Sequence, residues 1–353
     1  MKMFPSIILL LLLIISCSKS EEPQKIDTEL YFPSTTSNTW ETVSAESLGW
    51  NTTEIDPLLS FLEEKNTKGF IVLYNGRIVL ENYFNNHSEN STWYWASAGK
   101  TLTSIMTGIA EEQGFLDINK PVSTYLGTSW TSINLDKEIL ITPKHLLTMT
   151  SGLDDSLGDN VAPENLKYAA DAGFRWAYHN VYVKLQQIIE VTTSQTFSNY
   201  FSEQLKNKIG MTGTWIQLND LSVYWSNTRS MAKFGLLALN NGVWDSTRII
   251  NSNYFNRSIQ TSQTINNAYG YLWWLNGKEN YHLPQSQYEF QGSLIPNTPT
   301  DMYAALGKND QKIYVVPSKK LVIIRMGESA ANSNFAVSTF DYDLWEKINL
   351  VIN

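Results

Sequence analysis

The chain has 353 residues, with 26 Lys and Arg against 34 Asp and Glu, a formal net charge of −8 and a single cysteine. An acidic chain without a basic run lacks the clustered cations that nucleic-acid backbones require. One cysteine excludes an intramolecular disulfide or a thiolate metal cluster, and the scattered histidines lack the i, i+4 spacing of two ligands on one helix face. Hydrophobic residues make up 42% of the chain, which is ordinary for a folded globular protein. We therefore expect a folded globular protein, of one large domain or two interleaved ones, with no nucleic-acid partner or cofactor and with no sequence support for a metal site.

The first residues, MKMFPSIILLLLLIISCSKS, place a lysine before an apolar run that is shorter than the ~20 residues of a membrane span. This pattern predicts an export signal over residues 1–16. The end of the run resembles a bacterial lipobox, in which Cys17 becomes the acylated mature N-terminus. That resemblance implies a lipid-anchored protein of the bacterial cell envelope, on the periplasmic or surface side of the outer membrane. A plain secretory signal with an incidental cysteine is the alternative.

Residues 17–40 are polar, with two prolines and a Ser/Thr cluster, and show no apolar periodicity. Such a composition is typical of a flexible tether. We therefore expect one folded domain over residues 41–353, without an internal repeat or a second linker.

The first strand signal is Phe70–Phe84, where two β-rich runs flank Asn75-Gly76. This dipeptide favours a type I′ hairpin turn, in which both central residues have positive φ. Three more β-rich runs lie near the C-terminus, at 302–306, 312–316 and 321–326, and residues 340–351 can form a helix.

Between these strands, the apolar residues from Ser97 to about Leu239 follow a helical period. Strands at both ends with helices inserted predict an α+β fold. The antiparallel sheet should come from about 50–90 and 285–353, packed with helices, and the mainly helical region should span about 97–280.

Ser97-Ala-Gly-Lys100 is an S-x-x-K sequence at the start of a predicted helix. There the serine meets the positive end of the helix dipole, and unpaired backbone N–H groups can stabilise an oxyanion. A spacing of three residues brings Lys100 within reach of the Ser97 oxygen. A lysine kept from full hydration can accept the serine proton or hold a tyrosine as phenolate. A serine N-cap followed by a solvated lysine is the non-catalytic interpretation.

A second polar element, Tyr178-His179-Asn180, precedes another predicted helix. At a loop-to-helix junction these side chains can point into a cleft. A phenol can carry a proton to a leaving group, and an amide can bind a substrate carbonyl. A packed aromatic residue and an N-cap asparagine are the structural alternative.

In their order along the chain, these elements resemble the serine β-lactamase and penicillin-recognising superfamily, for which S-x-x-K is a signature. The resemblance is strongest to its class C-like branch of esterases, D-aminopeptidases and 6-aminohexanoate-dimer hydrolases. It implies that Ser97 is the acylated nucleophile, Lys100 its partner, Tyr178 the general base and acid, and Asn180 part of the substrate site. The matching blocks are S-x-x-K, Y-x-N, Thr142–Asp154, Ile209–Met211, Arg229–Leu237 with Gly242, and Tyr269–Trp274.

The third element of the superfamily departs from its pattern. Where β-lactamases carry K-T-G on a strand beside the site, this chain has Ala305-Leu-Gly307-Lys308. Gly307 can still admit substrate close to the backbone, and an N–H just beyond it can be a second oxyanion donor. The usual cation for a β-lactam carboxylate is missing, and Lys308 either replaces it or is a solvated loop residue.

Other polar residues fit structural roles. His179 occupies a variable position of its motif and is not expected to form a Ser–His pair, and His145 falls inside a helical block. Asp154 and Asp155 follow Ser-Gly and are expected in a turn. Core packing is expected for most tryptophans, with the lining of an aromatic cleft as the alternative for Trp93, Trp95, Trp176, Trp273 and Trp274.

These residues predict a serine hydrolase that cleaves a small ester or amide through an acyl-enzyme on Ser97. Within enzymes, penicillin-binding, D-Ala-peptidase or β-lactamase activity is the alternative, the peptidase acting on cell-wall peptides. From another class, a surface lipoprotein that binds without catalysis stays open.

Overall fold

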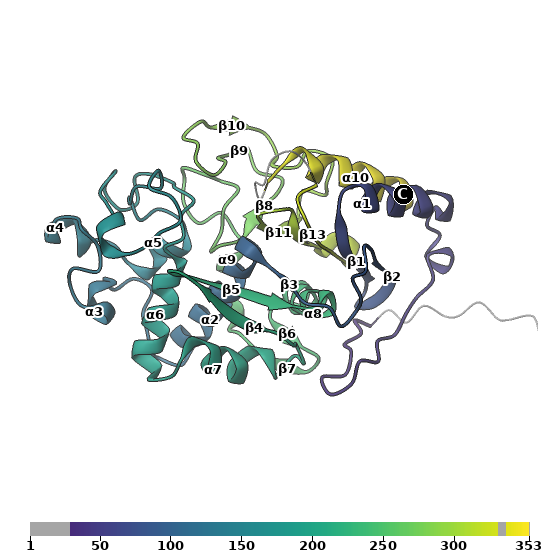
Figure 1. Ribbon diagram of the computed structural model, residues 1–353, viewed down its shortest axis with the longest axis horizontal. Helices are drawn as coiled ribbons and strands as arrows, with labels where there is room; N and C mark the ends of the chain where they lie inside the picture. Colours follow the sequence, from purple (N-terminus) through teal and green to yellow (C-terminus); the bar gives the residue numbers. More distant parts are fainter. Residues whose placement is uncertain (1–28, 331–336, 353) are drawn as a thin grey trace, which may run out of the picture.

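The computed structural model describes residues 29–330 and 337–352. Its centre is a six-stranded antiparallel sheet with the strand order β2-β1-β13-β12-β11-β8 (Figure 1). The first strands of the domain therefore pair directly with the last ones, which confirms the predicted α+β sheet built from both ends of the chain. The six strands are β1 (Thr67–Tyr74), β2 (Arg77–Tyr83), β8 (Trp274–Leu275), β11 (Tyr303–Gly307), β12 (Gln311–Val316) and β13 (Leu321–Gly327).

The hairpin between β1 and β2 turns at Asn75 and Gly76. Both residues have positive φ, 48° and 83°, as the type I′ prediction requires. A side chain at Gly76 is also sterically excluded, because a Cβ atom there would lie 1.9 Å from the carbonyl oxygen of Tyr31. This turn sets the register that pairs Tyr74 with Arg77.

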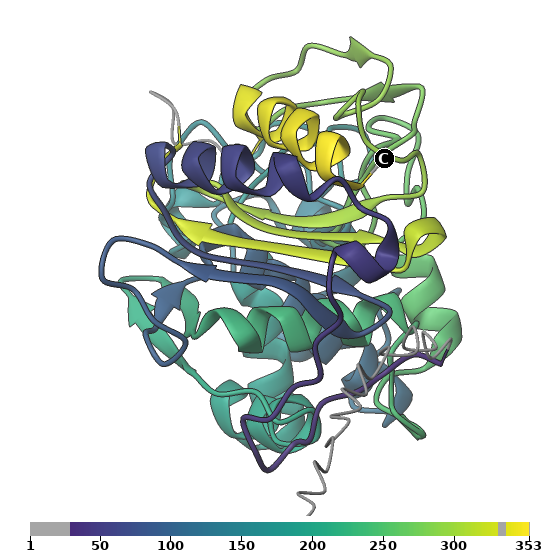
Figure 2. The ribbon, with the colours of Figure 1, turned by 90° about the vertical axis from the view of Figure 1, so that its right-hand side faces the viewer.

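Helices cover both faces of the sheet (Figure 2). The helices α1 (Ile55–Glu64) and α10 (Thr339–Ile352) pack together on one face, and α8 (Thr228–Leu239) packs against β12 and β13 on the other. Since neither face meets water, β12 and β13 are buried along their whole lengths. The predicted C-terminal helix and late strands are confirmed.

Helix α2 (Lys100–Glu112) is the buried centre of the second half of the molecule. Its apolar stripe, predicted from the sequence, is confirmed: Leu102, Ile105 and Met106 are at most 1% exposed. Each such side chain contributes about 1.5–3 kcal/mol when it is fully buried. The remaining helices are α3 (Ser123–Leu126), α4 (Leu135–Glu138), α5 (Pro143–Leu147), α6 (Tyr182–Thr193), α7 (Phe197–Phe201) and α9 (Ser252–Ser258).

The region predicted as mainly helical, 97–280, also contributes strands. A three-stranded sheet of order β3-β5-β4 lies beside α2, and β8 joins the edge of the main sheet. Short β-rich segments without a long alternating pattern gave no strand signal in the sequence. The strands outside the main sheet are β3 (Trp93–Tyr94) and β10 (Phe290–Gln291), which flank this region, and β4 (Thr214–Leu218), β5 (Leu221–Ser226), β6 (Val243–Trp244), β7 (Thr247–Arg248) and β9 (Asn280–Tyr281).

Residues 29–40 pack on the domain, which corrects the predicted start of the folded unit at residue 41. The indole N–H of Trp40 donates to the carbonyl of Gly76 at 2.8 Å, and the Phe32 ring contacts Trp244 at 5.1 Å. Aromatic burial thus holds a segment whose polar composition predicted a tether. The rest of that predicted tether, with Cys17 and the predicted signal, lies outside the described residues.

Among residues 29–330 and 337–352, no helix is long and apolar enough to cross a membrane.

Candidate active site

Ser97 lies in a 3₁₀ turn, η3 (Ala96–Gly99), that runs directly into α2. Ala96, just before it, has a φ of 48°, a left-handed conformation that is uncommon for a residue with a side chain. The backbone N–H of Ala98 donates to the carbonyl of Trp95 at 3.1 Å and closes the turn. This tight entry into the helix presents the half-buried Ser97 side chain at the predicted helix start.

Lys100 is buried, with 2% of its surface exposed, and its Nζ lies 2.7 Å from the Ser97 Oγ. The Nζ atom also lies 4.7 Å from the ring centres of both Tyr178 and Tyr182. Burial lowers the pKa of Lys100 to about 7, against a smaller opposing effect of the Asp159 charge. A large fraction of this lysine is therefore neutral at physiological pH, with a lone pair near the serine hydroxyl.

Tyr178 completes a three-residue constellation with Ser97 and Lys100. Burial raises the pKa of its phenol to about 12, although hydrogen bonds from Ser97 and Trp274 act in the opposite direction. The Tyr178 ring stacks on Trp274 with centroids 5.6 Å apart, and both contact Tyr269. The phenol is thus protonated near neutral pH and held by an aromatic cluster.

Asn180 joins the same group through its amide. Its Oδ1 accepts from the Lys100 Nζ at 3.0 Å, and its Nδ2 donates to the Asp159 Oδ1 at 2.7 Å. The structure therefore brings together the four residues that S-x-x-K and Y-x-N predicted to lie close to one another.

Sequence reasoning missed Asp159, Trp274 in its polar role, and Tyr182. Asp159 lies in the long loop before Tyr178, and no motif marks it. Trp274 was considered only as core or cleft lining, and the Tyr182 phenol donates to the carbonyl of Ser222 at 3.0 Å. No sequence signal marked Tyr182, because α6 begins at this residue and helical spacing does not relate it to Tyr178 in the preceding loop.

Gly307, the last residue of β11, lies against the turn that carries Ser97. A Cβ atom there would be 2.5 Å from the Trp95 carbonyl oxygen and 2.9 Å from the Ala98 nitrogen. Only glycine therefore allows this strand to approach the turn so closely. Lys308 follows it, but its side chain is exposed and, within the described part of the chain, forms no hydrogen bond or ion pair.

The residues for which a structural role was expected have one. Both ring nitrogens of His179 are buried without a hydrogen-bond partner among the described residues, and burial lowers its pKa to about 4. His145 completes a capping box with Thr142 at the start of α5. Asp155 forms an ion pair with Arg175 at 2.6 Å. None of these groups contacts Ser97.

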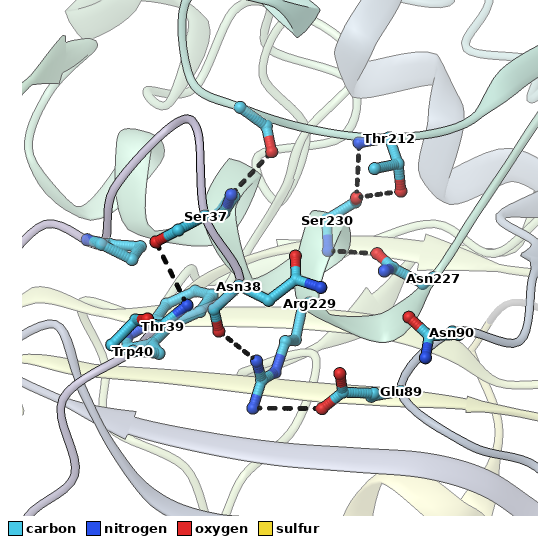
Figure 3. A pocket seen from close by; sticks show the side chains of 13 residues that line it. Ser37, Asn38, Thr39, Trp40, Glu89, Asn90, Thr212, Asn227, Arg229 and Ser230 are labelled. Atoms are coloured by element: carbon cyan, nitrogen blue, oxygen red, sulfur yellow. Dashed lines mark hydrogen bonds and ion pairs between the residues drawn. The ribbon is translucent and has the colours of Figure 1, made fainter.

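A separate polar pocket lies between residues 33–40 and the start of α8, and none of Ser97, Lys100, Tyr178, Asn180 and Gly307 lines it (Figure 3). Its most prominent cation, Arg229, is already paired: it donates to both Glu81 oxygens at 2.7 Å and to the Asn38 carbonyl at 2.6 Å. This arginine docks the N-terminal segment.

Among the described residues, no group of three or more His, Cys, Asp or Glu side chains is placed to hold a metal ion.

Solved structures share this architecture. A Bacillus anthracis protein proposed to be a 6-aminohexanoate-dimer hydrolase superposes with a TM-score of 0.69, at 20% identity over 92% of each chain. The hydrolase EstCE1, described as having promiscuous acyltransferase activity, gives 0.64 at 12% identity, covering 87% of this chain and 99% of its own. A class C β-lactamase from Rhodobacter sphaeroides gives 0.57 at 15% identity, covering 85% and 98%. At these identities the likeness is one of fold.

Sequence comparison extends the result. An uncharacterised protein from Alkalihalophilus pseudofirmus is 26% identical, covering 77% of this chain and 85% of its own. Residues 63–339 match the family described as Beta-lactamase, whose members are hydrolases, and this span includes every site residue described above. The chain therefore belongs to the β-lactamase family, within the serine β-lactamase and penicillin-recognising superfamily that its motifs resemble.

Proposed function

We propose that this protein is a serine hydrolase that cleaves an ester or amide through an acyl-enzyme on Ser97. The observation that carries the proposal is the contact between a buried lysine and a serine hydroxyl at 2.7 Å, with the pKa of that lysine lowered to about 7. A solvated lysine would be protonated and unable to accept a proton at neutral pH.

The residues support a closed path for one proton. Neutral Lys100 accepts the Ser97 proton while the serine oxygen forms a bond to the substrate carbonyl carbon. Tyr178, protonated because of its raised pKa, donates its proton to the leaving oxygen or nitrogen as the carbonyl–leaving-group bond breaks. The lysine ammonium then returns a proton to the phenolate. A water molecule then attacks the acyl carbon, the proton transfers run in reverse so that the water proton ends on the Ser97 oxygen, and the acid product leaves.

The backbone around Ser97 and Gly307 suits the negative charge that forms on the carbonyl oxygen. Gly307 lies against the serine turn, so N–H groups of the turn and of the end of β11 can converge on one oxygen. Preorganised donors of this kind typically contribute ~10²–10³-fold to the rate.

An ester or amide without an obligatory carboxylate fits the site better than a penicillin does. The residue that follows Gly307, Lys308, is exposed, and its side chain has no polar contact with the described residues that would hold it over the site. A free, solvated ammonium contributes little to binding compared with a buried, positioned cation.

The test is intact-protein mass spectrometry after incubation with a fluorophosphonate and, separately, with a labelled penicillin. We expect one phosphonyl adduct on the wild type, none on Ser97→Ala, and slow or no penicilloyl adduct. Labelling that persists in Ser97→Ala, or no labelling of the wild type at any pH between 5 and 9, would contradict the proposal and favour a binding protein. Rapid acylation by penicillin would favour a penicillin-binding enzyme or β-lactamase.

We also propose that Cys17 is acylated and anchors the protein to the bacterial cell envelope. The support is its position directly after a short apolar run that follows a lysine, and the fact that it is the sole cysteine. Metabolic labelling with an alkyne fatty acid should mark the wild type and leave Cys17→Ala unmarked. Labelling of both forms would contradict the proposal.

A further inference from the structure

Three hydrogen bonds connect the exposed Asp159 to the nucleophile. The Asp159 Oδ1 accepts from Asn180 at 2.7 Å, the Asn180 Oδ1 accepts from Lys100 at 3.0 Å, and the Lys100 Nζ lies 2.7 Å from the Ser97 Oγ. Of these four residues, only Asp159 belongs to neither sequence motif. Its carboxylate nevertheless lies at the end of a continuous polar path to the reacting atom.

The first consequence concerns the amide of Asn180. An asparagine side chain has an acceptor oxygen and a donor nitrogen on one carbon, whereas a carboxylate only accepts. With Asp159 beside it, the nitrogen must face the carboxylate and the oxygen must face Lys100, as observed. The reversed amide would place an oxygen against the carboxylate and a donor against the lysine. Asp159 thus excludes the amide orientation that could not bind Lys100.

The second consequence concerns charge. Four titratable side chains influence or contact the Lys100 ammonium: Tyr178 and Tyr182 through their ring faces, His179, and Asp159. The two phenols have raised pKa values and the imidazole a lowered one, so all three are neutral at pH 7. The remaining group is the Asp159 carboxylate, whose charge favours the protonated lysine.

The loop that carries Asp159 is braced against the segment that carries Tyr178. Arg175 pairs with Asp155 at 2.6 Å and donates to the Leu153 carbonyl at 3.4 Å, and Leu153 forms an isolated β-bridge with Tyr168. The carboxylate therefore comes from a loop fixed at its base on the same chain segment as Asn180.

We propose that Asp159 is a positioning residue of this site: its carboxylate fixes the Asn180 amide and holds a larger fraction of Lys100 in the protonated form, so that it sets the lower pH limit of Ser97 acylation. This inference rests on the proposed function of Ser97 and Lys100. It explains why an exposed acidic residue without a motif is hydrogen-bonded to the substrate-site asparagine.

The test is the pH dependence of Ser97 phosphonylation, measured as the second-order rate with a fluorophosphonate from pH 5 to 9. Asp159→Asn keeps an oxygen that can accept from Asn180 but removes the charge. Asp159→Ala removes both. Asp154→Asn is the matched control, since it removes one negative charge from the same loop and keeps the acceptor for the Ser156 N–H. Thermal unfolding shows whether each variant is folded.

For Asp159→Asn we expect the acid limb to move to lower pH by at least about 0.5 unit, a roughly threefold faster reaction at pH 6, with little change in the plateau. Asp159→Ala should show the same displacement and a plateau at least about fivefold lower, because the amide of Asn180 is no longer fixed. The control should follow the wild type.

Superimposable acid limbs for the wild type and Asp159→Asn would overturn the charge role, and equal plateaus for all variants would overturn the positioning role. These results differ from failure of the proposed function, in which the wild type itself would not be phosphonylated at Ser97.

Discussion

Two walls of the site meet at Ser97, and they fix their residues by different means. The helical wall consists of Lys100 on α2 with Tyr178 and Asn180 from the loop before α6, and it is connected by side-chain hydrogen bonds through one buried amine. The strand wall, residues 303–311 with the adjacent β8, is held by side-chain hydrogen bonds to its backbone and that of β13.

Two side chains fix the strand wall: Arg325 on β13 and Gln311 at the end of the wall itself. The buried Arg325 donates to the carbonyls of Asn309 at 2.9 Å and Asp310 at 3.0 Å, and the Gln311 amide donates to the Gly327 carbonyl at 2.6 Å. These bonds fix the path of the chain without placing a charge in the site. This difference fits the proposed function, in which the helical wall moves protons and the strand wall supplies shape, and each prediction below tests that division.

The largest loss is expected on the helical wall, for Lys100→Met. Without the amine, Ser97 has no base, and kcat on an ester should fall about 10³-fold or more. A well-folded variant with more than a tenth of wild-type activity would show that another group accepts the proton.

The same variant should be more stable than the wild type at pH 7, because a buried amine is replaced by an apolar side chain. Burial lowers the pKa of Lys100 from its ordinary 10.5 to about 7, so between these values the unfolded chain binds more protons than the folded chain. The free energy of unfolding of the wild type therefore rises with pH over this interval, because the cost of deprotonating Lys100 on folding becomes smaller. Thermal unfolding from pH 7 to 10 should show this contribution in the wild type and its absence in Lys100→Met.

The next largest loss of kcat is expected for Gly307→Ala on the strand wall. The new methyl group would collide with backbone atoms of Trp95 and Ala98, which cannot rotate away, so the strand must withdraw from the serine turn. We expect kcat to fall about 10²-fold with a smaller change in KM. Gly99→Ala is the matched control, since its φ is −66° and its new Cβ would meet only ordinary contacts at 3.7 Å or more. Equal kinetics for the two variants would contradict the shape role of the strand wall.

Trp274→Phe tests the link between the walls, because this strand residue hydrogen-bonds to and stacks on Tyr178 of the other wall. Phenylalanine keeps the stacking and removes the donor. Since that hydrogen bond lowers the pKa of Tyr178, its loss should raise this pKa further, make the phenol a weaker proton donor and reduce kcat on an ester about fivefold at pH 7. An unchanged kcat would show that the contact is only packing.

The smallest effect is expected for Lys308→Ala, because this side chain is exposed. Hydrolysis of a neutral ester should change less than about twofold. If instead Lys308 replaces the missing carboxylate-binding cation, acylation by a labelled penicillin should fall at least about tenfold while neutral-ester hydrolysis is unchanged. Parallel assays on both substrates separate the two outcomes.

Much of the fold was predictable because its signals are local. The Asn75-Gly76 turn, the late strands and the stripe on α2 each depend on neighbours within a few residues. Residues 29–40 and strand β8 were not predicted as part of the folded core, because their stability comes from contacts far along the chain. Trp40 binds a turn 36 residues away, and β8 pairs with β11.

The candidate site likewise has residues that the sequence predicts and features that only the structure shows. By itself, the sequence determined the identity and order of Ser97, Lys100, Tyr178 and Asn180, because the motifs S-x-x-K and Y-x-N place these residue types at fixed spacings that can be recognised without a structure. Only the tertiary structure decided that Lys100 is buried enough for its pKa to fall, and that Asp159 reaches Asn180 from a separate loop. Desolvation and charge depend on what surrounds a group in space, and local spacing along a chain carries no record of it.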